Sequence, residues 1–349
     1  MDRRLTRIDS NEMLWKRASI IRQVRSFFYN KNYLELDTPL LSGDLIPESC
    51  LEVFRTQRLF PQGSRQKSYP LWLIPSPEIW MKKIISRNRT NIFQICKCFR
   101  NGESTGFLHN FEFTMLEYYT MDADYIDSLK LTEELFKYLF EKEDMGITRI
   151  CADRGTEDAF LFERITVAQA FERFAGFDLF AAAAMGEGAM EKEAIRLGIE
   201  PMPGLTTAQL YDIIFIHSVE PRLKSEKPVA LIDYPAFVPC LAKNSADGKT
   251  CERWELYLNG IELANCFSEE TNPQKVKEYF INEEEKKTRD ALVTHRVDRN
   301  FFEMFETSRG FPRCSGVAMG LDRLIMALTG QSTIDSVLPF EKMPNINQE

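Results

Sequence analysis

Alternation of polar and apolar residues marks a hairpin in the first third of the chain. Residues 111–117 alternate between apolar and polar, as a strand with one buried face does, and a second strand-like run spans residues 91–99. Arg100 ends the first run, and His109 and Asn110 begin the second. The pattern predicts an antiparallel hairpin that carries a guanidinium and an aromatic ring toward one rim. Such a hairpin can hold a nucleotide, because Arg clamps phosphate and a Phe ring stacks on purine. An ordinary surface hairpin fits the bare pattern equally well.

Helical periodicity recurs along the rest of the chain. Apolar residues spaced three and four apart predict helices over residues 11–31, 122–142 and 206–218, and a long charged helix over 272–293. Residues 145–205 give the weakest pattern, which indicates a variable insertion.

A tight turn predicts a second hairpin near residue 260. Asn-Gly at 259–260 is the preferred dipeptide of a two-residue type I′ turn, which fixes the register of the strands on either side. Tyr257 then faces Glu262, and Glu255 faces Ala264. Glu255 and Glu262 would be diagonal neighbours on one face, about 7 Å apart at their backbones. Such a carboxylate pair suits Mg²⁺, which also takes substrate phosphates as ligands. A solvated acidic strand face is the alternative.

Composition excludes several classes of protein. The 349 residues are 44% hydrophobic and 28% charged, which is typical of a globular protein. A net charge of −8 argues against a protein that holds nucleic acid mainly through phosphates. No apolar run approaches the roughly 18 residues of a membrane span, so a cytoplasmic protein without membrane contact is expected. The eight cysteines fit reduced thiols better than a metal site, although Cys96 and Cys98 form a C-x-C pair.

Three stretches resemble the signature motifs of class II aminoacyl-tRNA synthetases. F-R-N and H-N-x-E-F-T-M-L-E within 99–117 resemble motif 2 in its lysyl form, Y-L-E-L-D-T-P at 33–39 resembles motif 1, and G-V-A-M-G-L-D-R at 316–323 resembles motif 3. S-P-E at 76–78 and G-I-E-L-A-N at 260–265 extend the resemblance. Five motifs in one order are more specific than any one of them.

The resemblance covers roughly residues 11–340 and implies a fold. That fold is α+β, an antiparallel β-sheet flanked by helices as in the class II aminoacyl-tRNA synthetase catalytic core. We expect one such catalytic domain over residues 1–349, with a variable insertion at about 145–205. Class II resemblance also implies a homodimer, with Pro39 at the interface. Only about ten residues precede the first predicted helix, so no anticodon-binding barrel is expected and tRNA is not the expected partner.

The resemblance further implies ATP as a substrate, Mg²⁺ as the metal, and activation of a carboxylic acid as its acyl-adenylate. It makes Arg100 and Arg323 the catalytic residues, and Glu255 and Glu262 the metal ligands. The implied ATP-binding residues are Arg100, Glu103, His109, Asn110, Phe113, Glu262, Leu263, Gly320 and Arg323. Those implied for the amino-acid substrate are Ser76, Glu78, Tyr119, Asn265, Phe267, Glu269 and Ala318.

The carboxylates among these residues point to a cationic amino acid, because a neutral one would leave a buried carboxylate without a counter-charge. Lysine or a lysine isomer fits. The lack of a barrel and the presence of Ala318 resemble the elongation factor P–(R)-β-lysine ligase family, since lysyl-tRNA synthetases tend to have Gly at that position. Those ligases transfer the activated acid to a lysine of elongation factor P.

The sequence departs from that family in places. One extra residue after Arg100 displaces to Glu103 the acid that should meet the adenine amine, and Cys266 stands where the family often has Gly. A β-bulge after Leu263 is needed to bring Asn265 onto the face of Glu262. Two rival functions remain: an adenylate-forming enzyme that charges tRNA or a small amine, and a catalytically silent dimer with a regulatory role.

Overall fold

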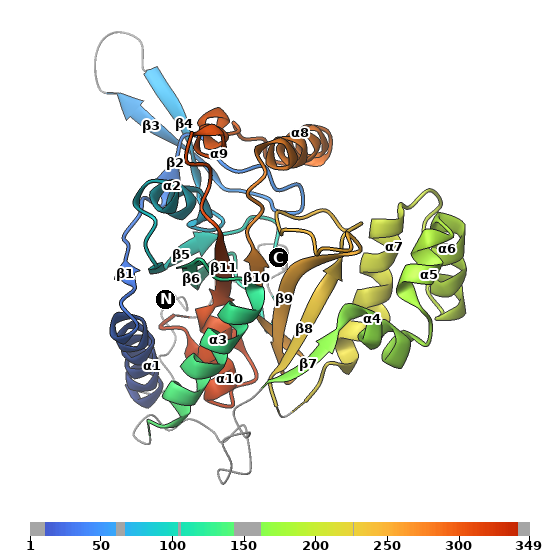
Figure 1. Ribbon diagram of the computed structural model, residues 1–349. Coiled ribbons are helices and arrows are strands. Elements are labelled where there is room, and N and C mark those ends of the chain that lie inside the picture. The colour runs from blue at the N-terminus through green and yellow to red at the C-terminus, as the bar shows by residue number, and fades with distance from the viewer. Residues whose placement is uncertain (1–10, 61–66, 104–105, 143–161, 226, 341–349) are drawn as a thin grey trace, which may run out of the picture.

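The computed structural model describes residues 11–60, 67–103, 106–142, 162–225 and 227–340 (Figure 1). Its strands are β1 (Leu34–Glu35), β2 (Leu41–Ser42), β3 (Arg55–Phe60), β4 (Lys67–Leu73), β5 (Ile92–Phe99), β6 (Glu112–Met121), β7 (Glu163–Thr166), β8 (Val229–Pro235), β9 (Thr250–Leu258), β10 (Ile261–Ser268) and β11 (Cys314–Gly320).

The α-helices are α1 (Asn11–Asn30), α2 (Glu78–Asn88), α3 (Tyr125–Phe140), α4 (Val167–Ala170), α5 (Leu179–Ala184), α6 (Glu187–Arg196), α7 (Thr207–Ile214), α8 (Pro273–Asp290), α9 (Glu303–Glu306) and α10 (Leu321–Leu328). Shorter turns of π-helix span Phe171–Ala175 and Phe215–Val219, and 3₁₀ turns span Glu220–Arg222, Arg299–Phe301 and Ile334–Val337.

A single eight-stranded sheet forms the centre of the molecule, with the strand order β1-β5-β6-β11-β10-β9-β8-β7. Its inner pairs are antiparallel, while the edge pairs β1–β5 and β7–β8 are parallel. The α+β class II fold is thereby confirmed, with a sheet that is mixed at its edges. A second sheet, β2-β4-β3, extends away from the body (Figure 1).

Helices α1, α3 and α10 cover one face of the large sheet (Figure 1). The core between them contains the inward side chains of every central strand, such as Tyr118, Trp254 and Val317. Trp254 is fully buried, and its indole N–H donates to the Tyr125 carbonyl at 2.6 Å. Because alternate residues of a strand point to opposite faces, this core leaves the other set of side chains free to build a site.

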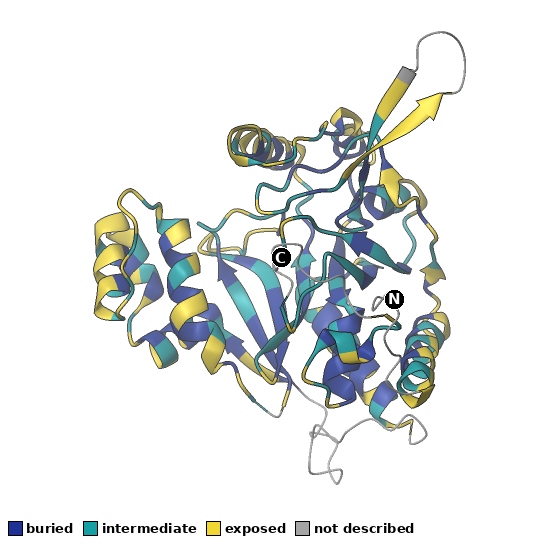
Figure 2. Ribbon diagram, turned by 180° about the vertical axis from the view of Figure 1, so that it is seen from behind, coloured by how far each residue is buried: buried dark blue, intermediate teal, exposed yellow. Residues whose placement is uncertain are grey.

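The opposite face is covered only at its ends. Helices α2, α8 and α9 pack over one end, and α4 to α7 form a separate group at the other, with its own core on β8 and β9 (Figure 1). Figure 2 shows buried central strands and exposed outer surfaces on α5, α6 and β3. The middle of this face is therefore accessible to a ligand.

Several helix boundaries differ from the sequence-based expectation. Helix α2 begins after Pro77, and no side chain caps it. Helix α3 begins after Asp124, whose carboxylate accepts from two backbone N–H groups, while Asp122 adopts a left-handed φ of 56°. Helix α8 begins directly after Asn272, as predicted, but ends at Asp290 rather than near residue 293.

The first part of the predicted insertion, 145–161, lies outside the described residues. From β7 onward the chain forms the helices α4 to α7. Phe171, at the start of the π-helical turn after α4, stacks on Tyr211 of α7 with ring centroids 5.3 Å apart. Among the described helices, none has the length and apolar character needed to cross a bilayer.

Candidate active site

The hairpin of β5 and β6 presents Arg100 at its open end. The two strands pair from Ile92–Tyr119 to Phe99–Glu112, and the Arg100 N–H then donates to the Phe111 carbonyl at 2.9 Å. The Arg100 guanidinium lies over the Phe113 ring, 5.2 Å from its centroid. The predicted hairpin is confirmed, and it holds a cation and a ring side by side.

The hairpin of β9 and β10 turns through Asn259 and Gly260, whose φ angles of 53° and 78° confirm the type I′ turn. Tyr257 pairs with Glu262 as predicted, but the register shifts between Glu262 and Ala264.

This bulge corrects one predicted pair. Glu255 faces Asn265 rather than Ala264, because Leu263 is the additional residue on β10. The bulge turns Asn265 and Phe267 onto the face that carries Glu262, as the placement of these side chains required.

Strand β11 lies between the two hairpins, and it pairs with β10 on one side and with β6 on the other. Across the sheet, Asn265 pairs with Ala318 and Ala318 with Glu117. One step along, a second row runs from Phe267 through Gly316 to Tyr119. Residues far apart in the sequence therefore form two adjacent rows on the accessible face.

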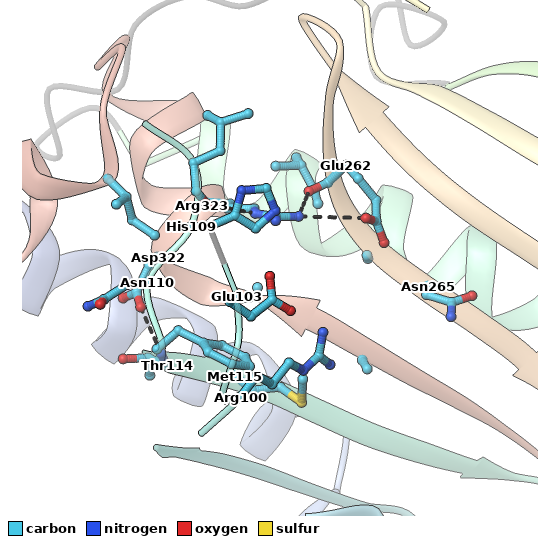
Figure 3. Close-up of a pocket in the computed structure, with 17 residues that line it drawn as sticks. Arg100, Glu103, His109, Asn110, Thr114, Met115, Glu262, Asn265, Asp322 and Arg323 are labelled. Atoms are coloured by element: carbon cyan, nitrogen blue, oxygen red, sulfur yellow. Dashed lines mark hydrogen bonds and ion pairs between the residues drawn. The ribbon is translucent and has the colours of Figure 1, made fainter. Parts of the chain in front are cut away.

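A cavity of about 350 Å³ opens on this face (Figure 3). Every residue that was predicted to bind ATP lines this cavity, and so do Asn265 and Ala318. Its lining residues are Arg100, Glu103, Leu108, His109, Asn110, Phe113, Thr114, Met115, Glu262, Leu263, Ala264, Asn265, Ala318, Gly320, Asp322, Arg323 and Ile334.

Two arginines face this cavity from different elements. Arg323, in the first turn of α10, donates to the carbonyls of Glu262 at 2.9 Å and Leu108 at 3.2 Å, and its guanidinium lies 3.6 Å from the Glu262 carboxylate. The adjacent Asp322 is buried, pairs with Arg17 at 2.6 Å and accepts from the Thr114 N–H at 2.7 Å. Asp322 thus fixes the start of α10 against β6, which holds Arg323 opposite Arg100 (Figure 3).

Several polar atoms of the cavity are buried without a hydrogen-bond partner in the described structure. They are Nε of Arg100, Oδ1 of Asn110 and Oδ1 of Asn265. Because a buried polar atom without a partner costs free energy, these atoms indicate a polar ligand rather than an apolar one. Two guanidinium groups, a ring and amide oxygens suit a nucleotide with its phosphates.

The carboxylates of Glu255 and Glu262 interact electrostatically. Burial raises the pKa of Glu262, the charge of Glu255 raises it further, and it reaches about 7. Among the described residues there is no group of three or more His, Cys, Asp or Glu side chains that could hold a metal alone. A pair of carboxylates fits Mg²⁺ in an ATP site, since phosphates and water complete its coordination.

The second row leads to a more deeply buried polar cluster. The Lys82 ammonium lies 2.5 Å from Glu78 and 2.7 Å from Glu269. A Cβ atom built on Gly316 would lie 2.6 Å from both the Glu269 carboxylate and the Tyr119 ring, so these side chains can occupy their positions only because residue 316 is glycine.

Sequence reasoning missed two members of this cluster, Lys82 and Glu117. Glu117 is 3% exposed; its Oε1 accepts from the Tyr119 hydroxyl at 2.8 Å, and its Oε2 has no partner in the described structure. Burial, followed by the charge of Glu78, raises the pKa of Glu117 well above its usual value. The signal for Glu117 was present, because it stands two residues before Tyr119 on one strand and must share its face.

Phe267 and Ser76, which were predicted to bind the amino acid, do not line this cavity. Phe267 packs its ring against the guanidinium of Arg253 at 5.4 Å. Ser76 is half-buried in the turn before α2. The Sγ atoms of Cys96 and Cys98 are 3.8 Å apart, and both are free thiols, as are the other cysteines in the described ranges.

Comparison with known proteins gives two findings. Residues 3–344 match the family model described as tRNA synthetases class II (D, K and N). The chain is also similar to two proteins named elongation factor P–(R)-β-lysine ligase. The one from Avibacterium paragallinarum is 32% identical over 332 residues, covering 95% of both chains. The one from Vibrio atlanticus is 33% identical over 334 residues, covering 94% of this chain and 95% of the relative.

Proposed function

Because this chain belongs to the class II tRNA synthetases of the D, K and N type, we propose that it activates lysine or (R)-β-lysine with ATP and transfers the acyl group to a lysine of elongation factor P. The protein is a ligase that uses ATP to form an amide. The observation that carries the proposed substrate is the continuity of the sheet face, which leads from the two arginines directly to a cluster of buried carboxylates.

The nucleotide end of this face suits phosphoryl chemistry. Arg100 would bind the α-phosphate, with Arg323 on the opposite side of the cavity, and Phe113 would stack on the adenine. Glu103 and the backbone of Leu263 would bind the base, and His109, Asn110 and Gly320 would contact the remainder of the nucleotide. The substrate carboxylate attacks the α-phosphorus, pyrophosphate leaves, and the acyl-adenylate remains. The protein contributes position and charge rather than covalent chemistry.

Glu255 and Glu262 would hold Mg²⁺, which supplies charge neutralisation at the phosphates when bound. Their mutual repulsion in the free protein is relieved by a cation placed between them.

The amino-acid end would recognise two ammonium groups. Glu78, Glu117 and Glu269 supply three carboxylates, of which Lys82 neutralises one charge. An amino acid with two ammonium groups would supply further counter-charge to this cluster, whereas one with an uncharged side chain would supply less. Asn265, Phe267 and Ser76 would complete the pocket. Ala318 pairs with Glu117 across the sheet, and its methyl group would set the depth available to the carbon that bears the amino group.

The quaternary structure that we propose is a homodimer. Exposed apolar side chains gather on α1 and the two short strands after it, at Trp15, Tyr29, Leu34, Leu40 and Leu41. Pro39 lies exposed between these strands. An apolar surface of this kind is typical of a two-fold interface.

Isotope exchange between pyrophosphate and ATP tests the activation step. We expect exchange that depends on lysine or (R)-β-lysine and not on neutral amino acids. A mass gain on elongation factor P, with no charging of tRNA, would support the acceptor. Charging of tRNA or of a small amine would favour the first rival function, and the lack of exchange with either isomer would favour a silent dimer.

A further inference from the structure

Arg253 is a partly buried cation on β9, two residues before Glu255 and on the same face of the sheet. Its Nη2 atom lies 2.5 Å from Oε1 of Glu255, and the two side chains are only 16% and 11% exposed. The guanidinium stacks over Tyr234, 4.3 Å from the ring centroid, and lies 5.4 Å from the centroid of Phe267. Arg253 is therefore held by two aromatic rings as well as by its carboxylate.

Both oxygens of Glu255 are fixed in this arrangement. Arg253 donates to Oε1, and the Tyr257 hydroxyl donates to Oε2 at 2.7 Å. A carboxylate oxygen has two acceptor sites, so each oxygen keeps one for a cation. The orientation of the carboxylate is set before any ligand binds.

The aromatic contacts connect this carboxylate to the amino-acid row. Phe267 pairs directly with Arg253 across β10 and β9, and it continues through Gly316 to Tyr119. Nε of Arg253 has no hydrogen-bond partner in the described structure. The Tyr234 and Phe267 rings flank the guanidinium, and Cys240 and Asp212 also interact with it.

We propose that Arg253 is a positioning residue, which orients the Glu255 carboxylate for a divalent cation and couples it to the amino-acid pocket. This inference rests on the proposed role of Glu255 and Glu262 as metal ligands. Residues that orient a metal ligand are worth about 10- to 100-fold in metal affinity.

The sign of the effect separates positioning from simple electrostatics. If Arg253 acted only through its charge, its removal would strengthen the binding of a cation nearby. If it acts by holding Glu255 in place, Arg253→Met should weaken binding, because the carboxylate is then free to turn away from the cation. Tyr234→Leu keeps the charge but removes the closer ring, so it should weaken binding by a smaller factor.

The test measures Mn²⁺ binding to the whole protein by electron paramagnetic resonance, with an ATP analogue that cannot be cleaved between the α- and β-phosphates. We expect binding about 10- to 100-fold weaker for Arg253→Met. The matched control is Arg164→Met, which breaks the Arg164–Glu133 pair at 3.0 Å on β7, away from the site. It should leave Mn²⁺ affinity unchanged, and its free energy of unfolding shows how much stability the loss of a partly buried ion pair removes.

Unchanged or tighter Mn²⁺ binding by Arg253→Met would overturn the inference and leave the proposed function standing. Absence of Mn²⁺ binding in the unmodified protein would overturn both. If Arg253→Met does not fold, Tyr234→Leu decides, since wild-type affinity in that variant would contradict a role for the stacked guanidinium. The Mg²⁺ concentration for half-maximal pyrophosphate exchange should rise in the same order as the Mn²⁺ dissociation constants.

Discussion

The Lys82 ammonium lies 2.7 Å from the Glu269 carboxylate, and both side chains are almost completely buried. The same ammonium contacts Glu78 at 2.5 Å, so the protein itself supplies one cation to a cluster that was expected to rely on the substrate alone. Burial lowers the pKa of Lys82, but Glu269 and Glu78 more than reverse this effect, and the amine stays protonated. The carboxyl groups of Glu78, Glu117 and Glu269 thus lie in one cluster with the Lys82 ammonium.

Replacing Lys82 should destabilise the fold strongly. Lys82→Met leaves two buried carboxylates without a counter-charge, and the loss of one member of a buried ion pair costs about 3–5 kcal/mol. The free energy of unfolding, measured by urea denaturation, checks this. The control Lys31→Met removes an exposed pair with Glu134 and should cost less than about 1 kcal/mol. Equal losses in the two variants would contradict the role assigned to Lys82.

Glu117→Gln should weaken binding of the amino acid selectively. The substitution keeps the size of the side chain but removes the carboxyl group that would ionise against an ammonium group. Of the three carboxylates, Glu117 is the one that Lys82 does not contact. Charge-assisted hydrogen bonds contribute about 1.5–3 kcal/mol, so KM for the amino acid should rise about 10- to 100-fold. KM for ATP should change little, and a rise in both constants would point to a general disturbance of the sheet.

Gly316→Ala tests the close contact in the second row. Its methyl group would overlap both Glu269 and Tyr119, and overpacking of this kind costs about 1–3 kcal/mol. We expect a higher KM for the amino acid and a lower melting temperature. Gly188→Ala, in helix α6 with no atom within 4 Å of the new methyl, should instead leave KM unchanged and stabilise the protein slightly. Similar behaviour of the two variants would refute the contact.

Amino-acid affinity should depend on pH near neutrality. Burial raises the pKa of Glu269, Lys82 lowers it, Glu78 raises it again, and the value is about 7. An ammonium ligand binds the ionised form, so binding releases a proton and affinity falls as pH drops below 7. Between pH 8 and pH 6, KM at saturating ATP should rise about ten-fold.

The same pKa shift has a defined effect on the free protein. Because the folded pKa exceeds the ordinary value of 4.5, Glu269 makes the fold less stable as pH rises from about 4.5 to 7.

The proton released on ligand binding can be measured directly. Calorimetry in buffers with different ionisation enthalpies would detect it. A KM that stays constant across this range would show that Glu269 does not titrate there.

Local elements could be read from the sequence because each depends on residues close together in the chain. The Asn259–Gly260 turn was predictable, since few residue pairs accept positive φ twice in succession. The strand after Arg100 followed from alternation, and α8 from the charged helical stretch that begins at residue 272. The residues that the family motifs implied for the nucleotide line one cavity, including the displaced Glu103.

The tertiary structure decided which side chains meet. The bulge at Leu263 reassigned the partner of Glu255, and helix α2 brought Lys82 between carboxylates from segments far apart in the sequence. Short-range sterics fix turns, strands and caps, so neighbouring residues specify them. The balance of buried charge depends on which distant segments pack together, and that is settled only when the sheet and α2 enclose the same space.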